Sequence, residues 1–170
     1  MAGLPGSGKT TQAKIISDKL GLCFIKTGEI LREMALSGSP KGQIARKALE
    51  KGKLVDNQIV VEIIKKRVYE SDCVNGFVMD GYPRSLDQIK LFDPGFDKVF
   101  YLKIAPERAK DRLLQRDRAD DTPFLIKERL RIQVLLLEKV MQYYKSKGKL
   151  VEVDGEKSWS EVANEIQKQI

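Results

Sequence analysis

The sequence predicts an α/β fold in which a parallel β-sheet is flanked by helices. Short apolar runs typical of buried strands alternate with longer stretches of helical periodicity, and this alternation favours parallel strands joined by helices. A glycine-rich pattern at the start, Gly3-x-x-x-x-Gly8-Lys9-Thr10, is typical of a phosphate-binding loop between a strand and a helix. The 170 residues contain no internal repeat and no low-complexity linker, so we expect one domain.

Each element is expected from a local pattern. Four apolar runs are expected to form strands: Leu22–Ile25, Phe77–Met79, Val99–Leu102 and Leu150–Val153. Six stretches are expected to form helices: Thr10–Leu20, Gln43–Lys51, Gln58–Tyr69, Pro106–Gln115, Pro123 to about Lys147, and Trp159–Gln169. Residues from about 27 to 57 contain two helical patterns and no strand, which predicts a small helical insertion attached to the sheet.

The composition argues against several classes of function. No apolar run approaches the roughly 20 residues that span a bilayer, and no signal peptide is recognised, so we expect a cytoplasmic protein. The chain has no histidine, which disfavours Ser-His-Asp hydrolysis and histidine-based metal sites. Its net charge of +7 indicates an anionic partner. Nucleic acid is disfavoured as that partner, because there is no long run of Lys and Arg and aromatic residues are sparse.

The two cysteines, Cys23 and Cys73, both lie in apolar or nearly apolar surroundings in the sequence. In a reducing cytoplasm such residues are usually buried free thiols. We therefore expect free thiols here, with a disulfide as the alternative.

The glycine-rich pattern has a specific physical meaning. Glycines let the backbone turn tightly, so that several N–H groups converge on phosphate oxygens at the positive end of the following helix. Lys9 adds a mobile cation for the β- and γ-phosphates, and the hydroxyl of Thr10 or Thr11 can assist Mg²⁺. A plain glycine-rich turn is the alternative, but the complete pattern followed by a helix favours nucleotide phosphate.

A buried strand normally precedes such a loop, yet only Met1 and Ala2 come before Gly3. We therefore expect the first, central strand to be missing, which would leave its neighbours with unpaired backbone groups. Two explanations are open: the natural protein starts upstream, which we favour, or the shortened product exists and is poorly active.

Five motifs, in order and at compatible spacing, resemble those of adenylate kinase in the nucleoside monophosphate kinase family of P-loop NTPases. GLPGSGKTTQ resembles the family's GxPGSGKGTQ, with Thr10 in place of a glycine, and TGEILRE resembles TGDLLR, with Glu29 in place of aspartate. GKLVDN is similar to GKLVPD, and GFVMDGYPRSLDQ to GFLLDGFPRTxxQ. DRLLQRDRADD followed by KER resembles the RLxxR … GRxDD … RL block.

The resemblance implies reversible phosphoryl transfer from ATP to AMP, giving two ADP, by a monomeric Mg²⁺-dependent enzyme. Residues 1–170 would then be a single P-loop kinase domain, with residues 27–56 as the NMP-binding helical insertion and residues 116–119 as a short lid loop. No structural zinc is expected, because the chain lacks the four cysteines that the zinc-binding lid of longer members uses.

The resemblance also assigns roles to residues. ATP is expected to contact Gly6, Ser7, Gly8, Lys9, Thr10, Thr11, Arg112, Arg116 and Lys157, the last near the base. AMP is expected to contact Thr27, Arg32, Lys53, Leu54, Val55, Gly81, Tyr82, Pro83, Arg84, Gln88, Arg118 and Arg129. The catalytic cations would be Lys9, Arg84, Arg116, Arg118 and Arg129, with Asp120 and Asp121 able to orient the arginines. Asp80 and Thr10 would hold Mg²⁺, with Asp80 acting through water.

Structural alternatives exist for some of these residues. Asp80 could merely cap the turn that follows it, and arginines spaced by four, such as Arg112 and Arg116, often mark a solvated helix face. Gln88 favours AMP, because its amide offers a donor and an acceptor that match adenine's amino group and ring nitrogen. The alternatives to adenylate kinase are a kinase for another nucleoside monophosphate, or a nucleotide-binding protein with little turnover because the first strand is missing.

Overall fold

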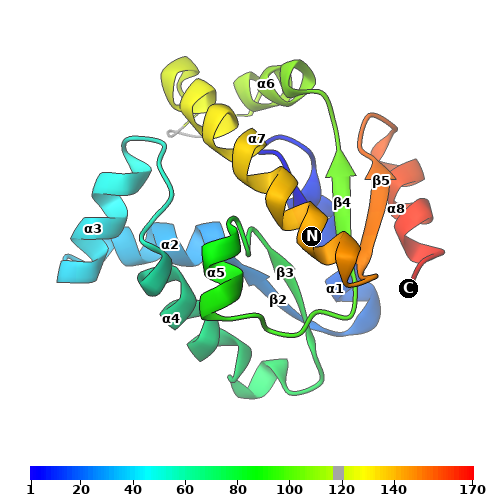
Figure 1. The fold of residues 1–170 in the computed structure, drawn as a ribbon, viewed down its shortest axis with the longest axis horizontal. Coiled ribbons are helices and arrows are strands. Elements are labelled where there is room, and N and C mark those ends of the chain that lie inside the picture. The colour runs from blue at the N-terminus through cyan, green and yellow to red at the C-terminus, as the bar shows by residue number, and fades with distance from the viewer. Residues whose placement is uncertain (117–120) are drawn as a thin grey trace.

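The computed structural model of the chain describes residues 1–116 and 121–170 and confirms the α/β architecture (Figure 1). Within these described residues, five parallel strands form two ladders, β1–β4–β5 and β2–β3. The strands are β1 (Ala2–Gly3), β2 (Cys23–Lys26), β3 (Phe77–Asp80), β4 (Val99–Lys103) and β5 (Leu150–Asp154). The four predicted runs are therefore strands, each displaced or extended by a single residue.

Helices cover both faces of the β1–β4–β5 ladder. On one face, α1 (Lys9–Leu20) and α8 (Trp159–Gln167) pack against Phe100 and Leu102 of β4. On the other face, α5 (Leu86–Leu91) and α7 (Pro123–Ser146) pack against Val99. Apolar residues therefore point to both sides of β4, as expected of a parallel strand that is buried on both faces.

The predicted helical insertion is present. It contains α2 (Thr27–Leu36) and α3 (Pro40–Leu49), followed by α4 (Asn57–Val68), and Figure 1 shows these helices on the side of the molecule opposite α8. Ser39 caps α3 by accepting the N–H of Gly42, and Pro40 occupies the first turn. Asp56 caps α4 by accepting two backbone N–H groups. The helices share a core with β2 and β3, which attaches the insertion to the sheet.

The remaining helices are α6 (Pro106–Leu114), as expected, and two short elements that were not predicted. These are the 3₁₀ turn η1 (Ser71–Cys73) and α5, whose six residues are too few to produce a clear helical period in the sequence. Among the described helices, none is long and apolar enough to cross a membrane.

The expectation that the first strand is missing was wrong. Ala2 and Gly3 form β1, which pairs in parallel with Tyr101 and Leu102 of β4. On the other side, the amino group of Met1 donates to the carbonyl oxygen of Met79 in β3 at 2.7 Å. Residues 1–3 therefore connect the two ladders and place the phosphate loop at the carboxyl end of β1.

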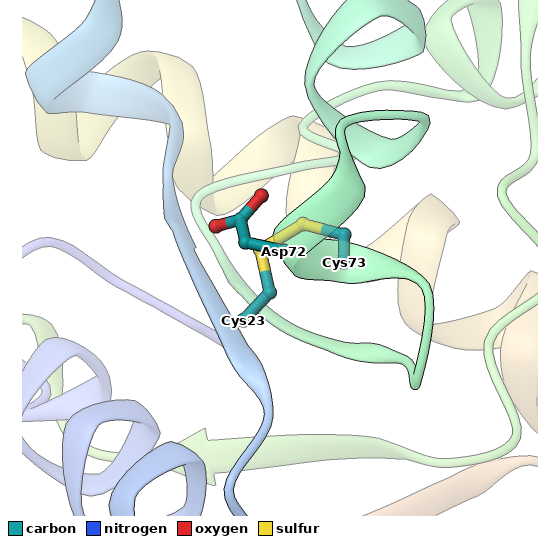
Figure 2. Close-up of side chains that lie close together, drawn as sticks. All are labelled: Cys23, Asp72 and Cys73. Atoms are coloured by element: carbon teal, nitrogen blue, oxygen red, sulfur yellow. A yellow bond between two sulfur atoms is a disulfide. The ribbon is translucent and has the colours of Figure 1, made fainter.

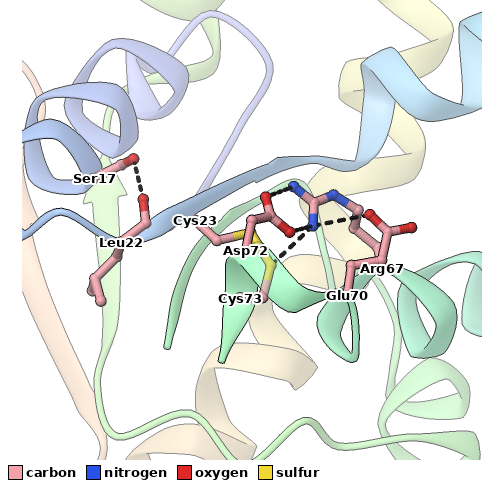
Figure 3. Close-up of a disulfide and its surroundings, with 7 residues drawn as sticks. All are labelled: Ser17, Leu22, Cys23, Arg67, Glu70, Asp72 and Cys73. Carbon is pink, nitrogen blue, oxygen red and sulfur yellow. Dashed lines mark hydrogen bonds and ion pairs between the residues drawn. A yellow bond between two sulfur atoms is a disulfide. The ribbon is translucent and has the colours of Figure 1, made fainter. Parts of the chain in front are cut away.

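The expectation of free thiols was also wrong. Cys23, at the start of β2, and Cys73, in η1, form a disulfide across a sequence separation of 50 residues (Figure 2). Arg67 lies beside the bond: its guanidinium donates to both carboxylate oxygens of Asp72 and to the sulfur of Cys73 (Figure 3). The closed loop contains α2, α3 and α4, so the disulfide links the two ends of the segment that carries the insertion.

Candidate active site

Side chains at the carboxyl ends of three strands line one cavity of about 190 Å³. The phosphate loop follows β1, Thr27 follows β2, and Asp80 ends β3. This edge is where ligands bind in open parallel sheets. The predicted site residues that line the cavity are Lys9, Thr10, Thr27, Arg32, Lys53, Leu54, Val55, Asp80, Gly81, Arg84, Gln88, Arg116 and Arg129.

The phosphate loop has the backbone that its glycines predict. Gly6 and Gly8 adopt φ angles of 85° and 87°, which L side chains rarely adopt. A Cβ atom at Gly6 would lie 2.5 Å from the carbonyl oxygen of Ala109 in α6, so the loop packs closely on that helix. Lys9, the first residue of α1, donates from Nζ to the carbonyl oxygen of Leu4 across the loop at 3.1 Å. The loop therefore combines a helix N-terminus with a lysine, the arrangement that binds phosphate.

Asp80 faces this loop. The hydroxyl of Thr10 donates to Asp80 Oδ2 at 2.5 Å. The other carboxylate oxygen, Oδ1, is buried and has no hydrogen-bond partner within residues 1–116 and 121–170. A turn-capping role would use that oxygen, whereas a carboxylate and a hydroxyl beside a phosphate loop fit the hard oxygen coordination of Mg²⁺. The residues present therefore fit the metal.

Two further buried polar atoms near the cavity lack partners in the described part of the chain, the hydroxyl oxygens of Ser7 and Thr27. Ser7 belongs to the phosphate loop, and Thr27 begins α2 directly after β2. Buried hydroxyls are nearly always hydrogen-bonded in folded proteins. The unused hydrogen-bonding capacity of these two hydroxyls indicates that a polar ligand completes this site.

Arg84 lies at the cavity wall, in the loop between β3 and α5, among other cations. Burial lowers the pKa of its guanidinium; nearby Asp80 opposes this shift, and the positive charges of Arg129 and Arg32 lower the pKa further. Its Nε donates to the carbonyl oxygen of Gly81 at 2.9 Å, which fixes the direction of the side chain. Three arginines thus repel one another beside the cavity, and a bound polyanion would relieve this repulsion.

Asp121 holds two of the cavity arginines together. Its side chain is only 1% exposed and accepts two hydrogen bonds from Arg116, at 2.6 and 2.9 Å, and one from Arg129 at 3.0 Å. Arg116 follows α6 and Arg129 belongs to α7, so one carboxylate aligns cations from two elements. The sequence prediction that Asp121 orients the arginines is confirmed.

The other wall of the cavity comes from the insertion and from α5. Arg32 lies in α2, and Lys53, Leu54 and Val55 lie in the loop between α3 and α4. Gln88, in α5, is 1% exposed and lines the same cavity. The cavity therefore has a phosphate loop on one side and a second wall that carries an arginine and an amide.

Comparison with known proteins assigns this arrangement to a family. The family model described as Adenylate kinase matches residues 1–149. Curated adenylate kinases from Leptospira biflexa and Methanocella arvoryzae are 37% and 33% identical to the chain; each alignment covers 99% of this chain, and 96% and 95% of the respective relative. Adenylate kinase 1 of Synechocystis is 34% identical over 98% of this chain and 92% of its own length. The chain belongs to the adenylate kinase family.

Four of the five cations expected from the adenylate kinase resemblance lie together at the cavity: Lys9, Arg84, Arg116 and Arg129. The fifth, Arg118, lies outside the described residues, as do Asp120 and residues 117–119 of the expected lid loop. Gly6, Ser7, Gly8 and Thr11 lie in the phosphate loop or the first turn of α1, and Tyr82 and Pro83 line a smaller cavity next to Arg84.

Of the residues expected to contact ATP, Arg112 and Lys157 lie outside both the main cavity lining and the phosphate loop. Arg112 lies on α6, the helix that packs on the phosphate loop. Lys157 lies between β5 and α8, where its amino group contacts Glu165 at 2.9 Å. The expected role of these two residues at the base of ATP stays a prediction.

The structure adds cavity residues that the sequence analysis missed. Gln133 is 8% exposed and lines the cavity one helical turn after Arg129 on α7. Lys26 and Glu29 also line it and form an ion pair at 2.5 Å. The i, i+4 spacing from Arg129 was a usable signal for Gln133. No such signal was present in the sequence for the Lys26–Glu29 pair, because surface pairs at i, i+3 are common on helices.

One group of three potential metal ligands occurs within the described ranges: Cys23, Asp72 and Cys73 (Figure 2). The two sulfur atoms are joined in the disulfide, and both oxygens of Asp72 accept hydrogen bonds from Arg67. We therefore assign no metal to this group.

Proposed function

We propose that the chain transfers the γ-phosphoryl group of ATP reversibly to AMP in the cavity described above, giving two ADP. The observation that carries this proposal is the convergence of Lys9, Arg84, Arg116 and Arg129 at one cavity beside the phosphate loop. These residues come from four separate segments of the chain. Together the two nucleotides carry roughly five to six negative charges, so bringing them end to end is the main obstacle to reaction.

The cations perform the chemistry by position and charge. Lys9 and the N-terminus of α1 hold the β- and γ-phosphates of ATP, while Arg84 and Arg32 hold the phosphate of AMP. Arg116 and Arg129, aligned by Asp121, stabilise the charge on the transferring group, and Arg118 completes this set. The attacking oxygen belongs to an ionised phosphate, so the reaction needs no general base.

Mg²⁺ would be held by Asp80, through water, and by Thr10; when bound, it neutralises part of the phosphate charge. The buried Oδ1 of Asp80, which has no hydrogen-bond partner among the described residues, supports this assignment. No structural zinc belongs to this proposal.

We further propose the division of labour within residues 1–170. The insertion, residues 27–56, holds AMP through Thr27, Arg32 and the loop 53–55, and Gln88 reads the base. Residues 116–119 form a short lid loop over ATP, whose base lies near Arg112 and Lys157. Tyr82 and Pro83 support Arg84 at the acceptor side. The enzyme acts as a cytoplasmic monomer on free nucleotides, without nucleic acid or membrane.

A coupled assay for ADP with AMP, GMP, CMP and UMP as acceptors tests this function. We expect AMP to be preferred, and Arg129→Met to lower kcat/KM by roughly 100-fold or more, as loss of a group that stabilises transition-state charge does. Arg131→Met is the matched control, because Arg131 lies on the same helix but is 61% exposed and pairs with Glu128.

Two results would contradict the proposal. Preference for CMP or UMP would refute the AMP assignment. Tight calorimetric binding of a bisubstrate dinucleotide without any ADP production would identify a nucleotide-binding protein instead of an enzyme.

A further inference from the structure

The amide of Gln88 is held at both ends by the protein. Its Oε1 accepts the backbone N–H of Arg84 at 2.7 Å, and its Nε2 donates to Oδ1 of Asn57 at 3.1 Å. Its own backbone is also fixed, because its N–H donates to Ser85 and its carbonyl oxygen accepts from the hydroxyl of Tyr82 at 3.1 Å. These contacts fix both the position and the orientation of the Gln88 amide.

These contacts define which end of the amide is which. The backbone N–H of Arg84 is only a donor, so an inverted Gln88 would place its own NH₂ group against another donor. Asn57, the first residue of α4, then accepts from the NH₂ end and closes the bridge between α4 and α5. Each end of the amide keeps one unused site, a lone pair on Oε1 and one N–H on Nε2.

The orientation matters because adenine and guanine present opposite patterns. Adenine offers an amino donor beside a ring-nitrogen acceptor, whereas guanine offers a carbonyl acceptor beside a ring N–H donor. An amide in one fixed orientation complements one of these patterns, and the inverted amide complements the other. Rotation of a loosely held amide would therefore allow either purine.

We infer that Asn57 is a specificity-determining positioning residue, which fixes the Gln88 amide so that the acceptor site takes adenine and rejects guanine. The inference rests on the proposed function, in which Gln88 reads the acceptor base. Asn57 acts through Gln88 and touches neither phosphate nor metal in this assignment. The predicted site residues did not include it.

Two isosteric substitutions test the inference. Asn57→Leu keeps the side-chain shape and removes the acceptor, while Asn57→Asp keeps an acceptor for Nε2. We expect Asn57→Leu to raise KM for AMP and to lower the AMP/GMP ratio of kcat/KM, each by about tenfold, the worth of one buried hydrogen bond. KM for ATP should stay within twofold. Asn57→Asp should keep or increase the AMP/GMP ratio, because its carboxylate cannot donate to an inverted amide.

The ratio is the decisive readout, because AMP and GMP carry the same charge and any electrostatic effect of the new carboxylate cancels. Gln58→Leu, at the next and exposed position of α4, is the control and should leave the ratio unchanged. If thermal melting shows that Asn57→Leu is not folded, Asn57→Ala replaces it.

The outcomes separate the two proposals. A wild-type protein that phosphorylates no nucleoside monophosphate overturns the proposed function. If the wild type uses AMP and the acceptor-free variant keeps its AMP/GMP ratio within twofold, only the present inference is overturned. Equal losses in Asn57→Leu and Asn57→Asp would also overturn it, because they would show a structural role for Asn57 alone.

Discussion

Asp121 determines how two cations of the site are presented. Because its buried carboxylate accepts from both Arg116 and Arg129, replacing it with asparagine removes the charge that aligns them. We expect Asp121→Asn to lower kcat/KM for AMP by roughly 10- to 100-fold, since misplacement of charged groups by about 1 Å has effects of this size. The measurement is steady-state kinetics with AMP and ATP varied in turn.

Glu50→Gln is the matched control for this prediction. Glu50, the residue after α3, also pairs with an arginine, Arg46 of that helix, but both side chains are more than 60% exposed. Such pairs contribute little, about 0–1 kcal/mol. A loss of activity in Glu50→Gln as large as in Asp121→Asn would show that general charge, and not alignment, is responsible.

Two buried tyrosines should respond in opposite ways to loss of their hydroxyl groups. The hydroxyl of Tyr82 contacts two backbone carbonyl oxygens, those of Gln88 and Phe92, whereas that of Tyr144 has no hydrogen-bond partner in the described part of the chain. We expect Tyr82→Phe to lower the free energy of unfolding by about 1 kcal/mol, and Tyr144→Phe to raise it by a similar amount. Urea unfolding at pH 7 measures both, with the exposed Tyr69→Phe as the unaffected control.

The same tyrosines predict the alkaline limit of stability. Burial raises the pKa of Tyr82 and of Tyr144, so above pH 10 the unfolded chain loses their protons more readily than the folded protein does. Stability should therefore fall as the pH rises above 10. The stability of Tyr144→Phe should fall less steeply with rising pH than that of the wild type. An identical slope in the two proteins would contradict this explanation.

Residues whose role follows from local spacing could be predicted from the sequence. The phosphate loop is an eight-residue pattern, and Asp121 lies five residues after Arg116, so their contacts depend on short-range geometry. Asn57 could not be predicted in this way. Its partner Gln88 is 31 residues away, and only the packing of α4 against α5 brings the two amides together.

At the scale of elements, length decided what the sequence could reveal. The strands β2 to β5 have four or five apolar-rich residues and were predicted within one residue, whereas β1 has two residues and no detectable period. Its strand geometry depends on a long-range partner, the backbone of β4. The Cys23–Cys73 link is equally non-local, so the sequence could only offer it as an alternative.

The disulfide makes the stability of the insertion depend on redox conditions. It closes a loop of 50 residues that contains α2 to α4, and chain entropy gives such a link a stabilising effect of about 4 kcal/mol. We expect dithiothreitol to shift the urea midpoint markedly downward. The double variant Cys23→Ser with Cys73→Ser should match the reduced protein and show no further response to dithiothreitol. Equal midpoints with and without reductant would show that the bond does not constrain the chain.

At the scale of the whole molecule, the net charge of +7 is not spread evenly over the surface. A cluster of arginines and Lys9 gathers at one cavity, where like charges repel each other and acidic side chains such as Asp80 and Asp121 offset part of the charge. Such a site is organised for a polyanion at the expense of the unliganded protein, which is a common relation between function and stability.

Arg84 and Arg67 provide a test of this relation. Burial, together with neighbouring arginines, lowers the pKa of Arg84, whereas the hydrogen bonds that Arg67 donates to the carboxylate of Asp72 raise the pKa of Arg67. We expect Arg84→Met to leave the free energy of unfolding of the free protein unchanged or to raise it by up to about 1 kcal/mol. The same substitution should lower kcat by roughly 100-fold or more. Arg67→Met should instead destabilise the protein by about 1–2 kcal/mol with near-normal kcat.

A bisubstrate dinucleotide completes this test. At 100 times its Kd, such a ligand stabilises the wild type by about 2.7 kcal/mol, and Arg67→Met should gain the same amount at the same ligand concentration. The ligand should stabilise Arg84→Met much less at that concentration, because this variant lacks the arginine that contacts the phosphate. Thermal melts of the three proteins with and without ligand measure this difference. An Arg84→Met protein that is several kcal/mol less stable without ligand would show that the charge cluster supports the fold, contrary to the electrostatic argument.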